Sequence, residues 1–315
     1  MTTNTTEHPD LTGTTPTITQ MADGGLETSL LFLQGVDLPD FAAFPLLDAP
    51  SGRDALNTYY QPYLGLAAER GLRLVLDTPT WRANPDWAAR LGYDREALAA
   101  VNRRAVAYLR ELAREAGPTL DVLYNGAVGP RGDGYVVGEV MTVGEAASYH
   151  ALQVRALAEG GVDTVTAVTM TYVEEAIGVA RAALAVGVPV VIGFTVETDG
   201  RLPSGMALGE AVASVEAATQ GAALGFMINC AHPSHFESVL GGDDAWLGRV
   251  VAVRANASRM SHEELDEAPE LDRGDPSELA DDYVRLRRLL PALTTVGGCC
   301  GTDHEHLATI TAALS

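Results

Sequence analysis

Eight short apolar runs, each followed by a longer segment with helical features, are what most limits the fold of this chain of 315 residues. Several runs, such as "VPVVIGFT", are apolar almost throughout and rich in β-branched residues. Such runs are typical of parallel strands that are buried on both faces, and their alternation with helices favours a parallel sheet. The predicted strands are residues 17–22, 72–77, 120–125, 162–169, 188–195, 223–229, 250–254 and 293–296.

The segments between these runs carry helix signals. Residues 94–117 have apolar side chains at helical spacing and end in glycine. Four other helix starts are indicated by capping residues: Thr142 with Glu145, Ser261 with Glu264, Thr302 with Glu305, and Asp275 followed by Pro276. Residues 261–277 are rich in Glu and Asp, and we expect them to form a surface excursion after the seventh strand.

Eight strand–helix units predict the α/β class and a single (β/α)8 TIM barrel that spans residues 17–315. An open, doubly wound sheet is the alternative, but the first run is not followed by the G-x-G-x-x-G pattern that such sheets often carry. Residues 1–16 are polar and rich in Thr, and we expect them to form a disordered tail.

The charged residues exclude several classes of function. The formal net charge is −21, and all 21 basic residues are Arg. An acidic surface repels nucleic acid and anionic membranes, so we expect neither as a partner. Schiff-base aldolases, pyridoxal phosphate enzymes and P-loop proteins all need a Lys, so the absence of Lys excludes these three classes.

Targeting signals and cysteine usage favour a cytoplasmic protein. The start of the sequence lacks a basic segment followed by an apolar core, and no apolar run approaches the ~20 residues of a membrane span. Three cysteines are too few, and odd in number, for a secreted disulfide scaffold. The sequence leaves open whether the protein forms a homo-oligomer.

Residues that could take part in catalysis or ligand binding follow five of the predicted strands, at 23–25, 77–81, 125–130, 229–233 and 297–301. The carboxyl ends of the strands of a (β/α)8 barrel meet at one face, and this face carries the active site. Cys230 follows the sixth strand, whereas Cys299 and Cys300 follow the eighth. We therefore expect all three cysteines to meet, although they are far apart in the sequence.

Three converging thiols suit a zinc ion, which binds thiolate sulfur at about 2.3 Å and keeps one position open in catalytic sites. Neighbouring residues of a regular strand point to opposite faces, so we expect the glycines around Cys299 and Cys300 to adopt positive φ and bring both sulfurs to one metal. Zinc with three thiolates is a weak Lewis acid and is poorly suited to activating water. A substrate thiol in the fourth position would be a nucleophilic thiolate, which indicates attack on an electrophilic carbon.

Five motifs are spread over nearly the whole chain: "DGGLET" from Asp23, "NGAVGP" from Asn125, "YHALQVRALAEGGVD" from Tyr149, "INCAHP" from Ile228 and "GGCCGT" from Gly297. Through these motifs the chain resembles the homocysteine S-methyltransferase family. The resemblance implies a zinc-dependent TIM barrel that transfers a methyl group to the thiol of homocysteine. It also implies that Cys230, Cys299 and Cys300 are the zinc ligands.

The predicted acceptor pocket departs from the pattern of the family that the chain resembles. Family members usually have a Glu after the fourth strand that holds the homocysteine ammonium, and Val168 stands at that place here. Glu27, Glu174 or Glu175 could replace this carboxylate; otherwise the acceptor carries no ammonium group. Arg254 stands where the family has a Tyr, and it could bind an acceptor carboxylate or face solvent.

We therefore predict a zinc-dependent S-methyltransferase with homocysteine as the leading acceptor and methionine as the product. The predicted metal ligands, which are also the catalytic residues, are Cys230, Cys299 and Cys300. The predicted substrate-binding residues are Asp23, Gly24, Gly25, Glu27, Thr78, Thr169, Asn229 and Arg254. The resemblance implies a donor such as a betaine, S-methylmethionine, S-adenosylmethionine or methylfolate. We find no corrinoid or folate module in the sequence, so we expect a small donor to bind directly.

Other interpretations stay open. The same chemistry could act on a different thiol, or the protein could bind zinc or a thiol without turnover. A zinc hydrolase is disfavoured, because three thiolates provide neither the usual His or carboxylate ligands nor a general base. Cys299 and Cys300 could instead form a vicinal disulfide, and His232 or His235 could replace a ligand beside Cys230.

Overall fold

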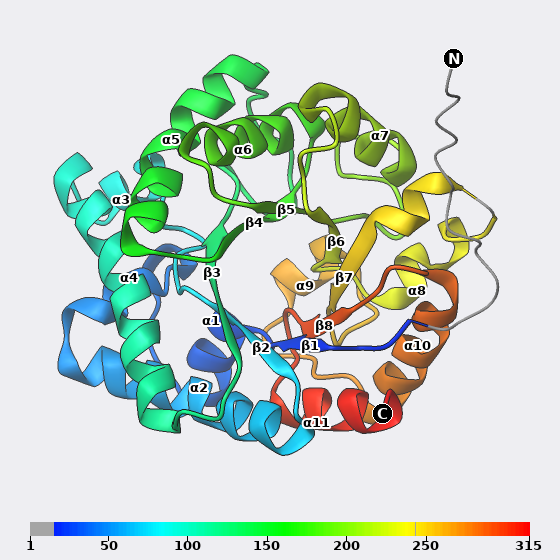
Figure 1. The fold of residues 1–315 in the computed structure, drawn as a ribbon, viewed down its shortest axis with the longest axis horizontal. Helices are drawn as coiled ribbons and strands as arrows, with labels where there is room; N and C mark the ends of the chain where they lie inside the picture. Colours follow the sequence, from blue (N-terminus) through cyan, green and yellow to red (C-terminus); the bar gives the residue numbers. More distant parts are fainter. Residues whose placement is uncertain (1–15, 243) are drawn as a thin grey trace, which may run out of the picture.

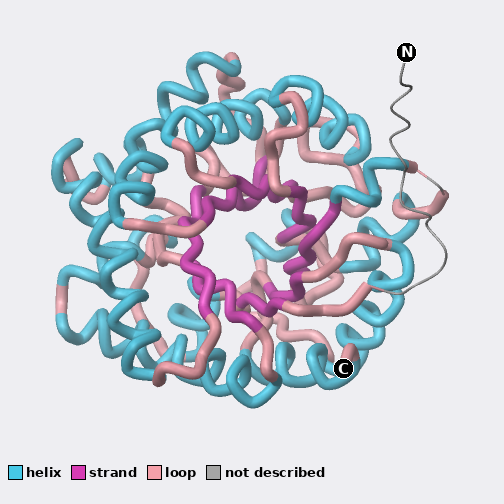
Figure 2. The backbone as a smooth tube through the Cα atoms, in the orientation of Figure 1, coloured by secondary structure: helices cyan, strands magenta, loops and turns pink. Residues whose placement is uncertain are grey.

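The strands close into a barrel of eight parallel strands that follow one another in sequence order, as the computed structural model of residues 16–242 and 244–315 describes (Figure 1). Figure 2 shows these strands as an inner ring surrounded by helices. The strands are β1 (Gln20–Ala22), β2 (Arg73–Asp77), β3 (Val122–Val128), β4 (Thr164–Met170), β5 (Val190–Phe194), β6 (Gly225–Asn229), β7 (Val250–Ala255) and β8 (Thr295–Gly298). The predicted (β/α)8 barrel is therefore confirmed, and the open sheet is excluded.

In the described part of the chain, the barrel is covered by seven long helices: α2 (Pro50–Arg70), α4 (Arg95–Ala116), α5 (Val143–Gly160), α6 (Val173–Val186), α7 (Leu208–Thr219), α10 (Pro276–Leu289) and α11 (His304–Ala313). Short α-helices are α1 (Leu26–Thr28), α3 (Pro85–Arg90), α8 (Pro233–Phe236) and α9 (His262–Glu267). Ser29–Leu33 is a π-helical turn, and Pro39–Phe41, Phe44–Asp48, Glu237–Val239 and Ala245–Arg249 are 3₁₀ turns. No helix within the described residues is both long and apolar enough to cross a membrane.

Each predicted strand contains or overlaps an observed one. The largest differences are three residues: β1 starts at Gln20 rather than at residue 17, and β3 ends at Val128 rather than at residue 125. The capping boxes at α5 and α9 are confirmed. The predicted box at α11 is wrong, because Asp303 caps this helix while the Thr302 hydroxyl donates to the Cys299 carbonyl. The predicted tail, residues 1–16, lies outside the described residues except for Pro16.

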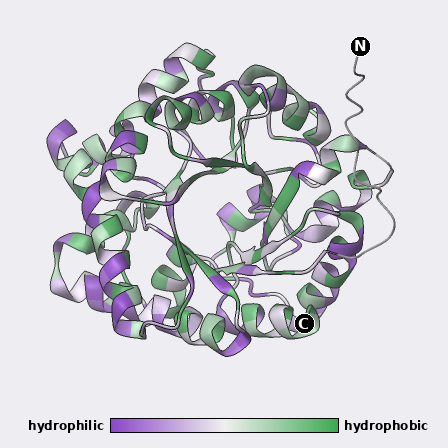
Figure 3. Cartoon of the chain, viewed as in Figure 1, coloured by the Kyte–Doolittle hydropathy of each residue, from purple (hydrophilic) through white to green (hydrophobic). Residues whose placement is uncertain are grey.

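Hydrophobic side chains concentrate on the strands and on the helix faces that pack against them (Figure 3). In β5, for example, Val190, Ile192 and Phe194 are fully buried. This burial explains why the strands appear in the sequence as continuous apolar runs rather than as alternating ones. The polar residues of the strands lie inside the barrel and at the mouth formed by the carboxyl ends of the strands.

Close packing between α5 and α6 depends on Gly178. A Cβ atom at this position would overlap the Ala146 side chain and lie 2.8 Å from the Ala146 carbonyl carbon. Gly178→Ala should therefore lower the free energy of unfolding by about 1–3 kcal/mol, even though Ala is the better helix former. Gly144→Ala is the control, since a Cβ atom there meets nothing within 4 Å. Equal stability of the two variants in urea would contradict this packing.

Candidate active site

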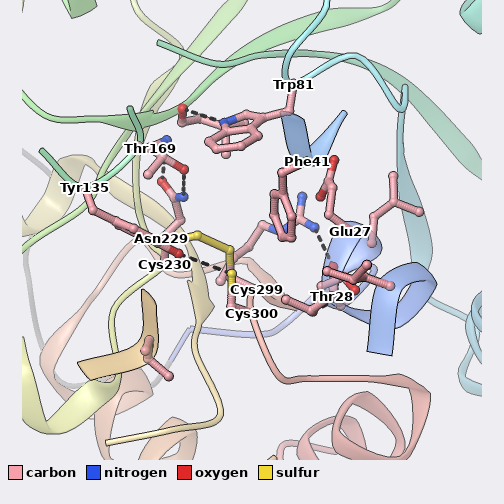
Figure 4. A pocket seen from close by; sticks show the side chains of 18 of the residues that line it. Glu27, Thr28, Phe41, Trp81, Tyr135, Thr169, Asn229, Cys230, Cys299 and Cys300 are labelled. Atoms are coloured by element: carbon pink, nitrogen blue, oxygen red, sulfur yellow. Dashed lines mark hydrogen bonds between the residues drawn. A yellow bond between two sulfur atoms is a disulfide. The ribbon is translucent and has the colours of Figure 1, made fainter. Parts of the chain in front are cut away.

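A pocket of about 350 Å³ opens at the carboxyl ends of the strands (Figure 4). All the residues predicted to act in catalysis or substrate binding line this pocket: Asp23, Gly24, Gly25, Glu27, Thr78, Thr169, Asn229, Cys230, Arg254, Cys299 and Cys300. They come from segments that are separated by most of the chain. The barrel therefore brings together the whole predicted set.

The three cysteine sulfurs form one cluster, with their Sγ atoms all within 4.8 Å of one another. Cys230 directly follows β6, and Cys299 and Cys300 directly follow β8. In this structure a disulfide joins Cys230 to Cys299, while Cys300 is a free thiol (Figure 4). The alternative of a vicinal bond between Cys299 and Cys300 is therefore wrong.

The glycines around Cys299 and Cys300 were all expected to have positive φ, but only one of them does, and close packing explains another. Gly301 has a φ of 80°, as predicted. Gly298 belongs to β8 instead, and a Cβ atom there would overlap the Thr302 side chain. A further left-handed residue is Cys230 itself, with a φ of 54°, which a non-glycine residue rarely adopts. The backbone thus turns sharply at Cys230, which the sequence placed directly after the sixth strand without indicating a turn.

The carbonyl of Cys230 explains how this conformation is held. It accepts hydrogen bonds from Thr195 Oγ1 (3.2 Å), Asn256 Nδ2 (3.1 Å) and His262 Nε2 (2.7 Å). These three side chains follow β5, follow β7 and begin α9. Polar groups from three parts of the barrel therefore fix the residue that carries the first sulfur.

Tyr135 is a residue of this site that the sequence did not single out. Its hydroxyl lies 3.3 Å from Cys300 Sγ, and its ring stacks on His262 with 4.1 Å between ring centroids. Tyr135 lies in the loop between β3 and α5, and nothing in its sequence surroundings signals this contact. Burial raises the pKa of the Cys300 thiol, so a nearby positive charge is needed to ionise it at neutral pH.

A buried charge cluster forms the floor on the other side of the cysteines. The guanidinium of Arg254 pairs with the carboxylates of Asp23 and Asp77, and its Nε donates to the Gly298 carbonyl at 3.1 Å. Burial opposes the charged form of Arg254, but Asp77 and Asp23 together raise the pKa of its guanidinium. Burial raises the pKa of Asp23 to about 6, while Arg254 acts in the opposite direction.

Only 12% of the Arg254 side chain is exposed. The alternative that Arg254 faces solvent is therefore wrong. The contact that we predicted with an acceptor carboxylate stays a prediction, and any such ligand would compete with Asp23 and Asp77 for the same guanidinium.

The end of β4 is shaped by a side-chain pair. Thr169 has a φ of 64°, and its backbone amide donates to Asn229 Oδ1 at 3.1 Å. Asn229 Nδ2 returns a bond to Thr169 Oγ1 at 2.9 Å. The Thr78 hydroxyl is engaged as well, since it accepts from the Ala127 amide at 3.0 Å. These polar atoms thus shape the wall, and Val168 adds an apolar surface to it.

Of the three carboxylates considered as replacements for the missing family Glu, Glu27 lines the pocket and the other two do not. Glu175 is buried and bonded to His150 Nε2 (2.8 Å) and to the amide of Arg131 (2.7 Å). Glu174 begins α6 without reaching the pocket. Burial raises the pKa of Glu27 to about 7.

The acidic segment after β7 closes one side of the pocket. Leu265 of α9 and several residues that follow it, up to Asp272, line the mouth, and Figure 1 shows α9 across the opening of the barrel. The predicted surface excursion at 261–277 is confirmed, since most of its side chains are exposed, and the structure adds that it borders the pocket. Trp81, which ends the predicted segment 77–81, adds an aromatic wall, and so does Phe41, which the sequence did not assign to the site.

The histidines near the cysteines point elsewhere. His232 bonds to Ser234 and faces Asp282 of α10, and burial lowers its pKa to about 4. His235 Nε2 bonds to the Arg259 carbonyl at 2.9 Å. Within the described residues, the cluster with metal-binding geometry is made of the three cysteines. A role for His232 or His235 as a replacement ligand is not supported.

The donor set fits zinc in its chemistry, and the three sulfurs are close enough to share one ion. Sulfur ligands at about 2.3 Å around a tetrahedral ion lie roughly 3.8 Å apart, so the bonded pair Cys230 and Cys299 would have to separate. Zinc binds thiolates, so the disulfide between Cys230 and Cys299 must be reduced before all three sulfurs can bind. The fourth position would then open into the pocket.

Comparisons with known proteins agree with this architecture. A sequence model of the homocysteine S-methyltransferase family matches residues 20–314. The metallated form of the homocysteine methyltransferase MmuM from Escherichia coli is 21% identical, with a TM-score of 0.71 over 94% of this chain and 96% of that chain. Its oxidised form is 20% identical, with a TM-score of 0.72 over 94% of this chain and 95% of that chain. At this identity the likeness shows the fold. A comparison with curated protein sequences found no match.

Proposed function

Because the chain belongs to the homocysteine S-methyltransferase family, we propose that it moves a methyl group from a small-molecule donor to the sulfur of a thiol, with Zn²⁺ held by Cys230, Cys299 and Cys300. Homocysteine is the leading acceptor and methionine the product, so the enzyme would serve methionine biosynthesis in the cytoplasm. The observation that carries the proposal is the cluster of three sulfurs within 4.8 Å at the mouth of the barrel.

The chemistry divides between the metal and the pocket. When bound, zinc would lower the pKa of the acceptor thiol and keep it as a thiolate at neutral pH, its proton passing to solvent. The pocket would then hold the donor so that its methyl carbon lies in line with this sulfur. A sulfur–carbon bond forms as the bond between the methyl carbon and the donor heteroatom breaks, and the electron pair stays on that heteroatom.

The dimensions and walls of the pocket support two small reactants. Its volume of about 350 Å³ is at the lower end of the range for small-molecule sites. Phe41, Trp81 and Tyr135 offer aromatic surfaces, which attract organic cations. We therefore favour a donor that carries its methyl group on a positively charged nitrogen or sulfur.

Zinc analysis combined with a methyl-transfer assay tests the proposal. The reduced protein should hold about one zinc ion per chain and form methionine from homocysteine with at least one onium donor. Zinc binding without transfer to any thiol would favour a non-catalytic zinc- or thiol-binding protein instead.

Oxidation should switch the activity off reversibly. Mild peroxide with a chelator should inactivate the enzyme, because neighbouring thiolates oxidise readily once the metal is removed. We expect the bond that forms to join Cys230 to Cys299, as in the structure. Thiol reductant with added zinc should restore the activity. A methyl-transfer assay and a titration of free thiols on the same samples would measure both changes. Activity that survives the loss of all free thiols would show that the cysteines are not catalytic.

A further inference from the structure

The charged side chains deep in the pocket are largely engaged with one another. Asp23, Asp77 and Arg254 form the ion-paired cluster described above. The guanidinium of Arg82 lies 3.8 Å from the ring centroid of Trp87, stacks on Trp81 as well, and donates to a backbone carbonyl. Asp23 and Asp77 thus share one guanidinium, and the acidic neighbour of Arg82 is Asp133 at 3.9 Å, so each of these charged groups has a partner of opposite charge within the protein.

Glu27 differs from these residues. Apart from its own backbone amide, no group in the described part of the chain hydrogen-bonds or ion-pairs with its carboxylate, although the side chain is half-buried and lines the pocket (Figure 4). A carboxylate that loses water without gaining a partner is unfavourable as an anion. Arg82 and Arg254 favour the ionised form of Glu27 from a distance and Asp23 opposes it, but neither guanidinium forms an ion pair with the Glu27 carboxylate.

The backbone around Glu27 is held against the cysteine loop. A Cβ atom at Gly25 would lie 2.6 Å from the Cys299 carbonyl oxygen, so the two segments are in direct contact. The amide of Gly301 donates to Thr28 Oγ1 at 3.3 Å on the other side of Glu27. Contacts on both sides hold the backbone at Glu27 against the cysteine loop, and its side chain lines the same pocket as the three cysteines.

We infer that Glu27 is the counter-ion for a positively charged group of a substrate and so determines which molecules the pocket accepts. The inference rests on the proposed function, since it assigns a substrate contact in the same pocket. The positively charged group could belong to either substrate. It is the ammonium of an amino-acid thiol or the onium centre of a methyl donor, and both are singly charged organic cations. Entry of either would give the carboxylate an ion-pair partner.

Binding of two matched pairs of compounds separates the sources without requiring turnover. Methionine and its analogue without the amino group report on an acceptor ammonium. Glycine betaine and its isostere with carbon in place of nitrogen report on an onium centre. Calorimetry would compare the wild type with Glu27→Gln and with Glu174→Gln, the control in which the same change lies outside the pocket.

The wild type should prefer the charged member of one pair by at least about tenfold, and Glu27→Gln should bring this preference close to one. Glu174→Gln should retain it. The pair that responds identifies the source of the cation. A wild type that discriminates in neither pair, or a preference that persists in Glu27→Gln, would overturn the inference. A wild type that binds these compounds as expected but transfers no methyl group would contradict the proposed function alone.

Discussion

Replacing Cys230, Cys299 or Cys300 with Ser, one at a time, should remove zinc and lower methyl transfer by at least about a thousandfold in each variant. Zinc at this site depends on three thiolates, and a serine hydroxyl stays protonated at neutral pH and is a poor zinc ligand. The three Sγ atoms all lie within 4.8 Å of one another, so no one of them is dispensable for a shared ion. Zinc analysis and a transfer assay on the same preparations measure both losses.

The fold of these variants provides the control. Exchanging sulfur for oxygen changes little volume, so the circular dichroism spectrum of each variant should match that of the wild type. X-ray absorption of the reduced wild type with zinc should show a shell dominated by sulfur at about 2.3 Å. A shell dominated by nitrogen or oxygen, or a Ser variant that keeps both zinc and activity, would contradict the assignment.

Arg254→Met should lower the free energy of unfolding by about 3–5 kcal/mol, because it leaves two buried carboxylates without their cation. Asp23 and Asp77 are 3% and 10% exposed, so water cannot replace the guanidinium. Urea unfolding followed by circular dichroism measures the loss. Arg103→Met is the matched control, since Arg103 pairs with Glu159 at 2.9 Å on the surface and its removal should cost less than about 1 kcal/mol.

The pH dependence of this loss tests its cause. Without Arg254, burial would raise the pKa of Asp23 further against the hydrogen bond from Tyr59, and the folded variant would hold a proton there that the unfolded chain releases above about pH 4. Stability falls with rising pH wherever the native state binds more protons than the unfolded state. The difference between Arg254→Met and the wild type should therefore be small in acid and grow towards neutral pH. A difference that does not vary with pH would point to lost packing instead.

Several features of the protein could be predicted because they depend on local patterns. Runs such as 188–195 are apolar throughout since both faces of a parallel strand are buried, and β5 is found there. The N-terminal caps of α5, α9 and α10 depend on residues within one turn of the helix.

The meeting of the cysteines was also predictable. Once the chain forms a (β/α)8 barrel, every strand ends at the same face, so residues after β6 and β8 must approach each other. The topology alone therefore placed Cys230 beside Cys299 and Cys300 without any knowledge of their contacts. The same rule brought Glu27 and Thr169 to the pocket.

Local sequence patterns thus predict the barrel and the residues that gather at its mouth, whereas the way those residues are paired follows from the folded structure. Arg254 turns inward to Asp23 and Asp77, and Tyr135 reaches Cys300 from a loop. Glu27 forms no ion pair with any residue that the structure describes. Such pairings depend on side-chain directions and on distances between segments far apart in the chain. Strand periodicity places a residue at the mouth of the barrel, but it does not specify which neighbour its side chain contacts, because that contact follows from three-dimensional packing and burial.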